Sequence, residues 1–182
     1  MITLGSGRFS GKTVTNLPVI AAKHMIVGTD KERIAVLISG NNDDDFCIKR
    51  ASDASNHHSR NVLVLTDGRV IQFGSIYNKC LTSVSDIDRA ISKHVVIEIV
   101  NSGEVYNTGS NWINITGKTV RNRMVQKYYD MGYERFYRAQ NLALEEIFKL
   151  LNGFGIKEDP GLWATPDIYK NWHRFFPPSN FS

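Results

Sequence analysis

One carboxylate stands out in this sequence because it lies within a run of apolar residues. Glu98 occupies the middle of the segment HVVIEIVNSG, residues 94–103, and β-branched residues flank it on both sides. Burying a carboxylate costs several kcal/mol unless the group is paired, protonated or bound to a ligand. Two interpretations remain open at this point: Glu98 faces a cleft in which an acidic group can do chemistry, or it has a structural partner.

The segment around Glu98 predicts a strand that is buried on both faces, because a short apolar run ends in the turn residues Asn101, Ser102 and Gly103. Two apolar runs before it, residues 19–27 and 34–38, are further candidate strands. Residues 40–60, which follow the second of these runs, are polar and rich in turn formers, so we expect a loop there. Its three consecutive aspartates, Asp43 to Asp45, are expected to form a solvated acidic turn.

The clearest local signal is a hairpin. Residues 61–65 and 69–73 flank Thr66-Asp67-Gly68, and Asp-Gly is a strong tight-turn signal. Residues 104–118 predict a long excursion with a small hairpin, and Ser85 is a candidate cap for a short helix over residues 86–92. Apolar residues at steps of three and four predict a long helix over 137–151, which Asn152-Gly153 should end.

The 182 residues predict one domain with two appendages. Residues 1–18 are rich in Gly, Ser and Thr and are expected to form an extended arm. Residues 19–161 form the domain itself. The tail over 162–182 combines prolines with aromatic residues, a composition typical of a segment without regular structure that packs on the body or on a partner.

Composition excludes several classes of protein. No stretch approaches the length of a membrane span, and no signal peptide is visible at the N-terminus. Two cysteines, Cys47 and Cys80, are too few for a disulfide scaffold or a Cys-type zinc motif. The formal charge of +4 weakly favours acidic partners, including nucleic acid, cell-wall polymers and acidic protein surfaces. Because the basic residues are scattered, nucleic acid ranks last among these.

The order of these elements resembles the zinc-dependent N-acetylmuramoyl-L-alanine amidases of type 2, which share their fold with peptidoglycan recognition proteins. SRNVLVLTDGRVIQF, residues 59–73, is similar to the family's hairpin, and VVIEIVNSG, residues 95–103, is similar to its I-G-I-E-L-V-N-x-G strand. FYRAQNLALEEIFKLLNGFGI, residues 136–156, is similar to its last long helix. Trp112 with the ITGK of residues 115–118 is similar to a W-x-G-K stretch of bacteriophage endolysins.

The resemblance implies an α/β fold with a mixed central sheet flanked by helices and a shallow peptidoglycan groove. In the family, a zinc ion activates water and polarises the amide carbonyl, and a Glu on the buried strand assists proton transfer. By position that residue is Glu98, which would account for a carboxylate in an apolar strand.

The zinc ligands of the family do not carry over. The family's first strand ends in I-V-x-H-H-T, and matching it to MIVGTD, residues 25–30, puts Gly28 where a ligand belongs. The family's G-H turn after the long helix has no counterpart, although KEDPG, residues 157–161, is similar to its K-x-D-P-G segment. Asn61 also stands where the hairpin of the family has a His. A catalytic zinc requires three protein ligands in fixed geometry.

Other side chains offer an alternative metal site. Of the five histidines, His57 and His58 lie in a polar segment and His94 opens the buried strand. His24 lies on the first candidate strand, and His173 would reach the groove if the tail folded back over it. His24, Asp159 and His173 are therefore the alternative zinc ligands, although we expect no cofactor.

The sequence thus predicts an amidase-like, peptidoglycan-directed domain that has lost its metal site. Its phage-like features predict a structural or cell-wall-contacting protein of a bacteriophage virion, in the tail or baseplate, with peptidoglycan or neighbouring virion proteins as partners. The expected location is the virion or the host cytoplasm and cell wall. The alternative is an active zinc amidase that cleaves the bond between muramic acid and L-alanine, with Glu98 as a catalytic residue.

Overall fold

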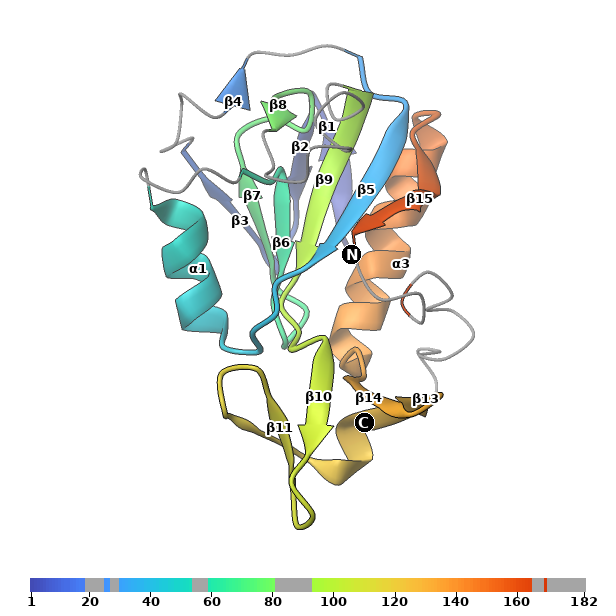
Figure 1. Ribbon diagram of the computed structural model, residues 1–182. Coiled ribbons are helices and arrows are strands. Elements are labelled where there is room, and N and C mark those ends of the chain that lie inside the picture. Colours follow the sequence, from blue (N-terminus) through green and yellow to red (C-terminus); the bar gives the residue numbers. More distant parts are fainter. Residues whose placement is uncertain (19–24, 27–29, 54–58, 81–92, 165–168, 170–182) are drawn as a thin grey trace.

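A computed structural model describes residues 1–18, 25–26, 30–53, 59–80, 93–164 and 169 of the chain. Its centre is a six-stranded sheet with the strand order β15-β5-β9-β6-β7-β3 (Figure 1). In chain order these strands are β3 (Val14–Leu17), β5 (Arg33–Ile38), β6 (Val62–Val64), β7 (Val70–Phe73), β9 (His94–Ile99) and β15 (Lys157–Ala164). Strands β15, β5, β9 and β6 run parallel, whereas β7 is antiparallel to β6. The sheet is therefore mixed, as the resemblance implied.

Strand β9 lies inside this sheet, and every one of its residues is buried. Parallel strands on both sides, β5 and β6, satisfy its backbone groups, and β-branched side chains pack well on a pleated surface. The prediction of a strand buried on both faces is confirmed.

The two faces of the sheet pack against different helices (Figure 1). Val95, Ile97 and Ile99 of β9 point to the face covered by α3 (Arg138–Gly153), which contributes Leu144, Ile147 and other side chains to the main core. Val96 and Val100 point to the opposite face, where α1 (Asp44–Ser52) contributes Cys47. Because side chains alternate along a strand, Glu98 shares the α1 face.

The predicted hairpin is confirmed. β6 and β7 pair with Val64 opposite Val70, and the amide of Gly68 donates to the carbonyl of Leu65 at 3.0 Å. Gly68 has a φ of +81°, and a Cβ at this position would lie 2.7 Å from the carbonyl oxygen of Ala139 at the start of α3. The turn therefore requires glycine for its backbone angle and for its close approach to the helix.

A second sheet, with all pairs antiparallel, lies beyond the ends of β5 and β9, at the bottom of Figure 1. Its strand order is β12-β11-β10-β14-β13. The strands are β10 (Glu104–Asn107), β11 (Trp112–Asn114), β12 (Thr119–Val120), β13 (Val125–Tyr128) and β14 (Met131–Glu134), with the 3₁₀ helix η3 (Asn122–Met124) between β12 and β13. The pairing of β10 with β11 confirms the small hairpin predicted within residues 104–118.

The loop expected over residues 40–60 is wrong in part, because α1 lies within it. Asp43 is the N-cap of this helix, and its side chain accepts a hydrogen bond from the amide of Phe46 at 3.0 Å. Asp44 and Asp45 lie in the first turn, where the helix dipole favours negative charge. The aspartates start a helix instead of forming a solvated turn; only Cys47 of this helix is buried, so its apolar pattern is weak.

The N-terminal residues do not form an arm. β1 (Thr3–Gly5) pairs with β2 (Arg8–Ser10), and β3 pairs in parallel with β7 as an edge strand of the central sheet. Phe9 is fully buried in the main core. Ile2 is buried in the same core, so apolar side chains and strand pairing both attach this segment to the body.

The remaining sequence predictions concern the ends of elements and the tail. The long helix begins and ends within two residues of the predicted limits. β15 crosses the expected border between domain and tail at residues 161–162, and Tyr169 of the tail is fully buried against Phe136, with a centroid distance of 5.0 Å. The short helix over 86–92 lies outside the described residues. Within the described part of the chain, no helix combines the length and the apolar character needed to cross a membrane.

Candidate functional site

The carboxyl ends of the parallel strands β5, β9 and β6 meet at one edge of the central sheet, a common place for ligand sites in α/β folds. Residues 39–43 follow β5 and lead into α1, and Asn101 to Gly103 follow β9. The hydroxyl of Ser39 joins these two loops, because it donates to the carbonyl of Asn41 at 2.6 Å and accepts from the amide of Asn101 at 3.0 Å. The side chain of Ser39 thus holds the two loops together through their backbone groups.

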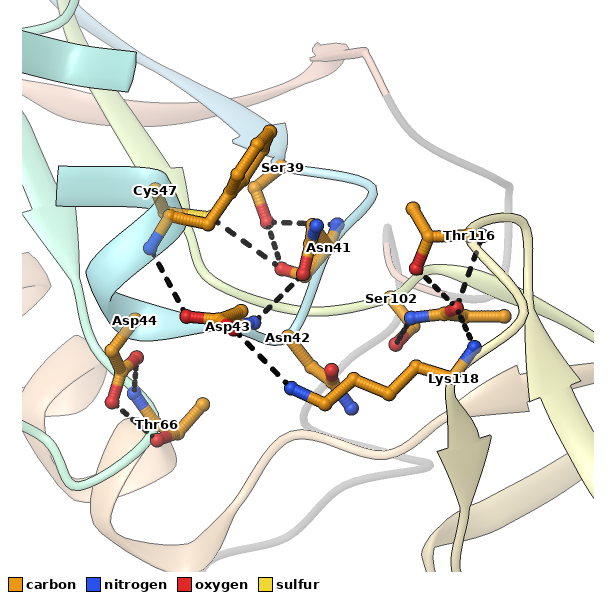
Figure 2. Close-up of polar contacts among 12 residues, drawn as sticks. Ser39, Asn41, Asn42, Asp43, Asp44, Cys47, Thr66, Ser102, Thr116 and Lys118 are labelled. Carbon is orange, nitrogen blue, oxygen red and sulfur yellow. Dashed lines mark hydrogen bonds and ion pairs between the residues drawn. The ribbon is translucent and has the colours of Figure 1, made fainter. Parts of the chain in front are cut away.

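The start of α1 is fixed to the same edge (Figure 2). Asp44 accepts two hydrogen bonds from Thr66, from the amide at 2.9 Å and from the hydroxyl at 2.7 Å, and so ties the helix to the β6–β7 turn. The side chains of Asp43 and Lys118 form an ion pair at 3.5 Å, which connects α1 to the β11–β12 hairpin. These contacts place one face of α1 over β9.

Glu98 has structural partners of opposite charge. Its Oε1 accepts a hydrogen bond from Nη2 of Arg50 in α1 at 2.9 Å, and its Oε2 lies 2.5 Å from Nε of Arg60. The second contact is an ion pair without hydrogen-bond geometry. The side chains of Glu98 and Arg60 are 5% and 4% exposed, whereas that of Arg50 is 36% exposed. Of the two interpretations that the sequence left open, the structure shows the paired carboxylate.

This cluster, Arg50, Arg60 and Glu98, carries two positive charges and one negative charge, a net charge of +1. Nη1 of Arg60 is buried and has no hydrogen-bond partner among the described residues. A buried ion pair of this kind contributes less to stability than its attraction suggests, but removing one partner leaves an uncompensated buried charge. The cluster therefore favours anions over cations.

Asn61, which stands where the family has a His, is wholly occupied by structural bonds. Its Nδ2 donates to the carbonyls of Ser75 and Asn78 at 3.2 and 3.1 Å, and its Oδ1 accepts from the amide of Val96 at 2.9 Å. The thiol of Cys80 donates to the same Oδ1 at 3.2 Å. Asn61 fixes the start of β6 against β9 and has no exposed surface.

A second buried carboxylate lies at the end of β14. Glu134 accepts hydrogen bonds from the amide of Ser102 at 2.6 Å, from Nδ2 of Asn42 at 3.0 Å and from the hydroxyl of Tyr137 at 3.2 Å. Burial raises the pKa of Tyr137, and the negative charge of Glu134 adds to this effect. Glu134 contributes to the lining of a pocket of about 380 Å³ whose rim carries Arg121 and Arg123.

The tail reaches this network. The hydroxyl of Tyr169 lies within hydrogen-bond distance of two acceptors that share its one proton, the carbonyl of Glu134 at 2.5 Å and Oδ1 of Asn101 at 3.0 Å. Burial raises the pKa of Tyr169 well above its ordinary value, so the hydroxyl remains a donor at neutral pH. A residue of the predicted tail thus stabilises the turn that follows β9.

Two of the three alternative metal ligands lie outside the described residues, so that site stays a prediction. His24 and His173 lie outside them, and so does Gly28. Asp159 lies in β15, between the two stretches of that strand that pair with β5. His94 is buried at the start of β9. In the part of the chain that the structure describes, no three His, Cys, Asp or Glu side chains are grouped so that they could hold a metal ion.

Of the candidate strand over residues 19–27, the structure describes Met25 and Ile26. β4 (Met25–Ile26) pairs with β8 (Lys79–Cys80) in a separate two-stranded sheet. β5 runs parallel to β9, with Leu37 opposite Glu98, and leads into Ser39.

The described residues at this edge do not fit the zinc centre of the family. Next to Glu98 the strand β5 presents Leu37, and the groups around the carboxylate are guanidinium groups, which cannot ligate a metal. Arg50 and Arg60 were not among the predicted site residues, because both lie in the segment that was expected to be a loop. A helix over residues 44–52 would have put Cys47 and Arg50, three residues apart, on the same face.

Neither a protein-family model nor a curated protein matches this sequence. Two solved structures match the fold. The structure of PlyL has a TM-score of 0.56 and 13% sequence identity, over 89% of this chain and 93% of that chain. The structure of a selenomethionine derivative of AmpD has a TM-score of 0.52 and 10% identity, over 92% of this chain and 96% of that chain. At these identities the likeness shows the fold alone: the chain has an amidase-like, mixed α/β fold.

Proposed function

We propose that this chain is an amidase-like domain that binds peptidoglycan without cutting it, and that Glu98 has become part of the scaffold. The fold and the sequence resemblance support the first half of this proposal. The pairing of Glu98 with Arg50 and Arg60 supports the second half, and it is the single observation on which the loss of activity rests.

The physical reason is that a general acid or base must reach the proton that it moves. Each carboxylate oxygen of Glu98 already contacts a guanidinium group, and the residue is 4% exposed. A substrate amide would have to displace Arg50, the more exposed partner, to approach it.

The absence of a resident metal is part of the same proposal. Three protein ligands would be needed, and the cluster around Glu98 has a net charge of +1, which opposes a divalent cation. The rival function, an active zinc amidase, would have to use His24, Asp159 and His173.

The proposed setting is a bacteriophage virion, where the domain serves as a structural or cell-wall-contacting part of the tail or baseplate. This setting extends the resemblance to phage endolysins. Peptidoglycan and neighbouring virion proteins are the proposed partners.

The test combines three measurements on the full chain: cosedimentation with purified peptidoglycan, release of peptide from the same material, and zinc content by elemental analysis. We expect cosedimentation without release of peptide, and zinc far below one equivalent. Glu98→Gln should leave the absence of hydrolysis unchanged and lower stability.

Stoichiometric zinc together with hydrolysis that Glu98→Gln abolishes would establish the rival function. A protein that neither sediments with peptidoglycan nor hydrolyses it would overturn the peptidoglycan assignment itself.

A further inference from the structure

The second sheet carries a pocket that lies apart from the Glu98 cluster. Its volume is about 370 Å³, and its lining includes Tyr106, Asn107, Trp112, Lys127, Tyr129 and Asp130. These residues come from β10, β11, β13 and the turn between β13 and β14, and none of them takes part in the contacts of Glu98. Three aromatic side chains, an amide, an ammonium group and a carboxylate thus surround one hollow.

Trp112 lies flat on the sheet. A Cβ at Gly132 would come within 2.4 Å of the six-membered ring of its indole, so one face of the ring covers the backbone of β14 where a side chain would otherwise stand. The ring also packs on Val105, Val120 and Met124, a small core of its own. Trp112 is only partly buried and belongs to the lining of the pocket, so part of the indole faces the hollow.

Tyr129 stands at the edge of the same pocket in an unusual conformation. It is 87% exposed and has a φ of +53°, a left-handed angle that non-glycine residues adopt uncommonly. Its ring contacts that of Tyr128 edge to face, with a centroid distance of 4.6 Å. Tyr106 on β10 is 45% exposed. An aromatic side chain held out by a strained turn is a feature that packing within the chain does not explain.

The polar side chains of the pocket have groups that can still bind a ligand. Neither Lys127 nor Asp130 forms an ion pair within the described residues, and the ammonium group of Lys127 lies 6.0 Å from the centroid of the Trp112 ring. Asn107 uses its Oδ1 to accept from the amide of Gly109 at 2.7 Å, so its Nδ2 is left to donate. One positive and one negative charge cancel within the pocket.

We propose that this pocket binds a saccharide, and specifically the glycan strand of the cell wall. A pyranose ring has faces of C–H groups that pack on aromatic rings, and its edge carries hydroxyl and acetamido groups that hydrogen-bond to amides, carboxylates and ammonium groups. An anionic polymer such as nucleic acid would instead require a basic groove, and this pocket is neutral in sum. The choice of glycan rests on the proposed function.

The experiment titrates the full chain with an oligosaccharide of β-1,4-linked N-acetylglucosamine and follows amide chemical shifts. We expect saturable shifts for residues of β10, β11 and the β13–β14 turn. Tyr129→Asn removes an exposed ring while keeping a residue that tolerates a left-handed angle, and it should weaken binding about tenfold. Gly132→Ala should displace the indole and weaken binding as much. Phe154→Ala, which removes an aromatic side chain that is 58% exposed beyond the end of α3, is the matched control and should bind as the wild type does.

The outcomes separate this inference from the proposed function. Cosedimentation with peptidoglycan in the absence of oligosaccharide binding would overturn the saccharide site and leave the proposed function intact. Oligosaccharide binding without cosedimentation would support a saccharide site and contradict both its assignment to the cell-wall glycan and the proposed function. If Tyr129→Asn abolished binding to another virion protein while oligosaccharide affinity was unchanged, the pocket would be a protein interface and the inference would be wrong.

Discussion

At the scale of single residues, Glu98 links the fold of this chain to its proposed function. The carboxylate of Glu98 lies in an apolar strand, where an unpaired charge would be costly. Ion pairs with Arg50 and Arg60 compensate this charge. Arg60 makes this contact from a site that is almost wholly buried, whereas Arg50 reaches it from the surface of α1. The carboxylate is thereby a structural counter-ion for a buried cation, and stability depends on both partners.

Glu98→Gln should lower the free energy of unfolding by about 3–5 kcal/mol, because it leaves the guanidinium of Arg60 buried without a counter-ion. Urea unfolding followed by circular dichroism measures this change. The control is Glu32→Gln, which removes the exposed ion pair of Glu32 with Lys93 and should cost about 1 kcal/mol or less. Equal stability of Glu98→Gln and the wild type would show that the carboxylate is not needed as a structural partner.

The buried thiol of Cys80 should make the free energy of unfolding depend on pH in the alkaline range. Burial raises the pKa of its thiol from 9.0 to about 12. Between pH 9 and about pH 12, the Cys80 thiol keeps its proton in the folded state and loses it in the unfolded chain. The thiol therefore has no effect on the pH dependence below pH 9, and above it the free energy of unfolding falls by about 1.4 kcal/mol per pH unit.

Comparison of the wild type with Cys80→Ser checks this slope, because serine keeps a hydrogen-bond donor for Asn61 but does not titrate in this range. Urea midpoints at pH 8, 9 and 10 should fall more steeply for the wild type. Parallel pH profiles would contradict a buried, protonated thiol.

At the scale of elements, the contacts between the β6–β7 turn and its two neighbouring helices position the site. Asp44 joins the turn to α1 on one face of the sheet, and Gly68 approaches α3 on the other. This turn was predicted from the Asp-Gly dipeptide alone, but its contacts with both helices were not. The edge where β5, β9 and β6 end is therefore held from both sides.

Gly68→Ala should destabilise the protein more than the same change at Gly117. Both glycines have left-handed angles, +81° and +82°, so the backbone strain is matched at about 1–2 kcal/mol. At Gly117 nothing lies within 4 Å of a Cβ, whereas at Gly68 the backbone of Ala139 does. Overpacking should add about 1–3 kcal/mol at Gly68, which thermal or urea unfolding of both variants would measure. Equal losses would mean that the turn and α3 are not in close contact.

At the scale of the whole molecule, the N-terminal segment is part of the folded body. Gln72 of β7 is fully buried, accepts from the amide of Phe9 at 2.7 Å, and donates to the carbonyls of Gly7 and Gly74, both at 2.8 Å. One side chain thus joins the β1–β2 hairpin to the central sheet. The Gly- and Ser-rich composition of this segment gave no indication of that attachment.

Gln72→Leu should cost about 1–3 kcal/mol, because it removes the acceptor of the buried amide of Phe9. Hydrogen exchange of the amides in β1 and β2 should accelerate more than that of β9. Gln126→Leu is the control, since the side chain of Gln126 bonds only to the backbone of Lys127 in an exposed position. Unchanged exchange in β1 and β2 would mean that the hairpin is held by other contacts.

The sequence by itself determined the elements whose signals are local: the doubly buried strand around Glu98, the Asp-Gly hairpin, the small hairpin after β9 and the long amphipathic helix. Each depends on residues close together in the chain, and together with the resemblance they predicted the mixed α/β fold. Only the tertiary structure decided which strands lie beside β9, since β5 and β6 pair with it from positions far away along the chain. It also decided that Glu98 is paired, because Arg50 and Arg60 lie 48 and 38 positions away along the chain and reach the carboxylate only once α1 and β6 have packed against β9.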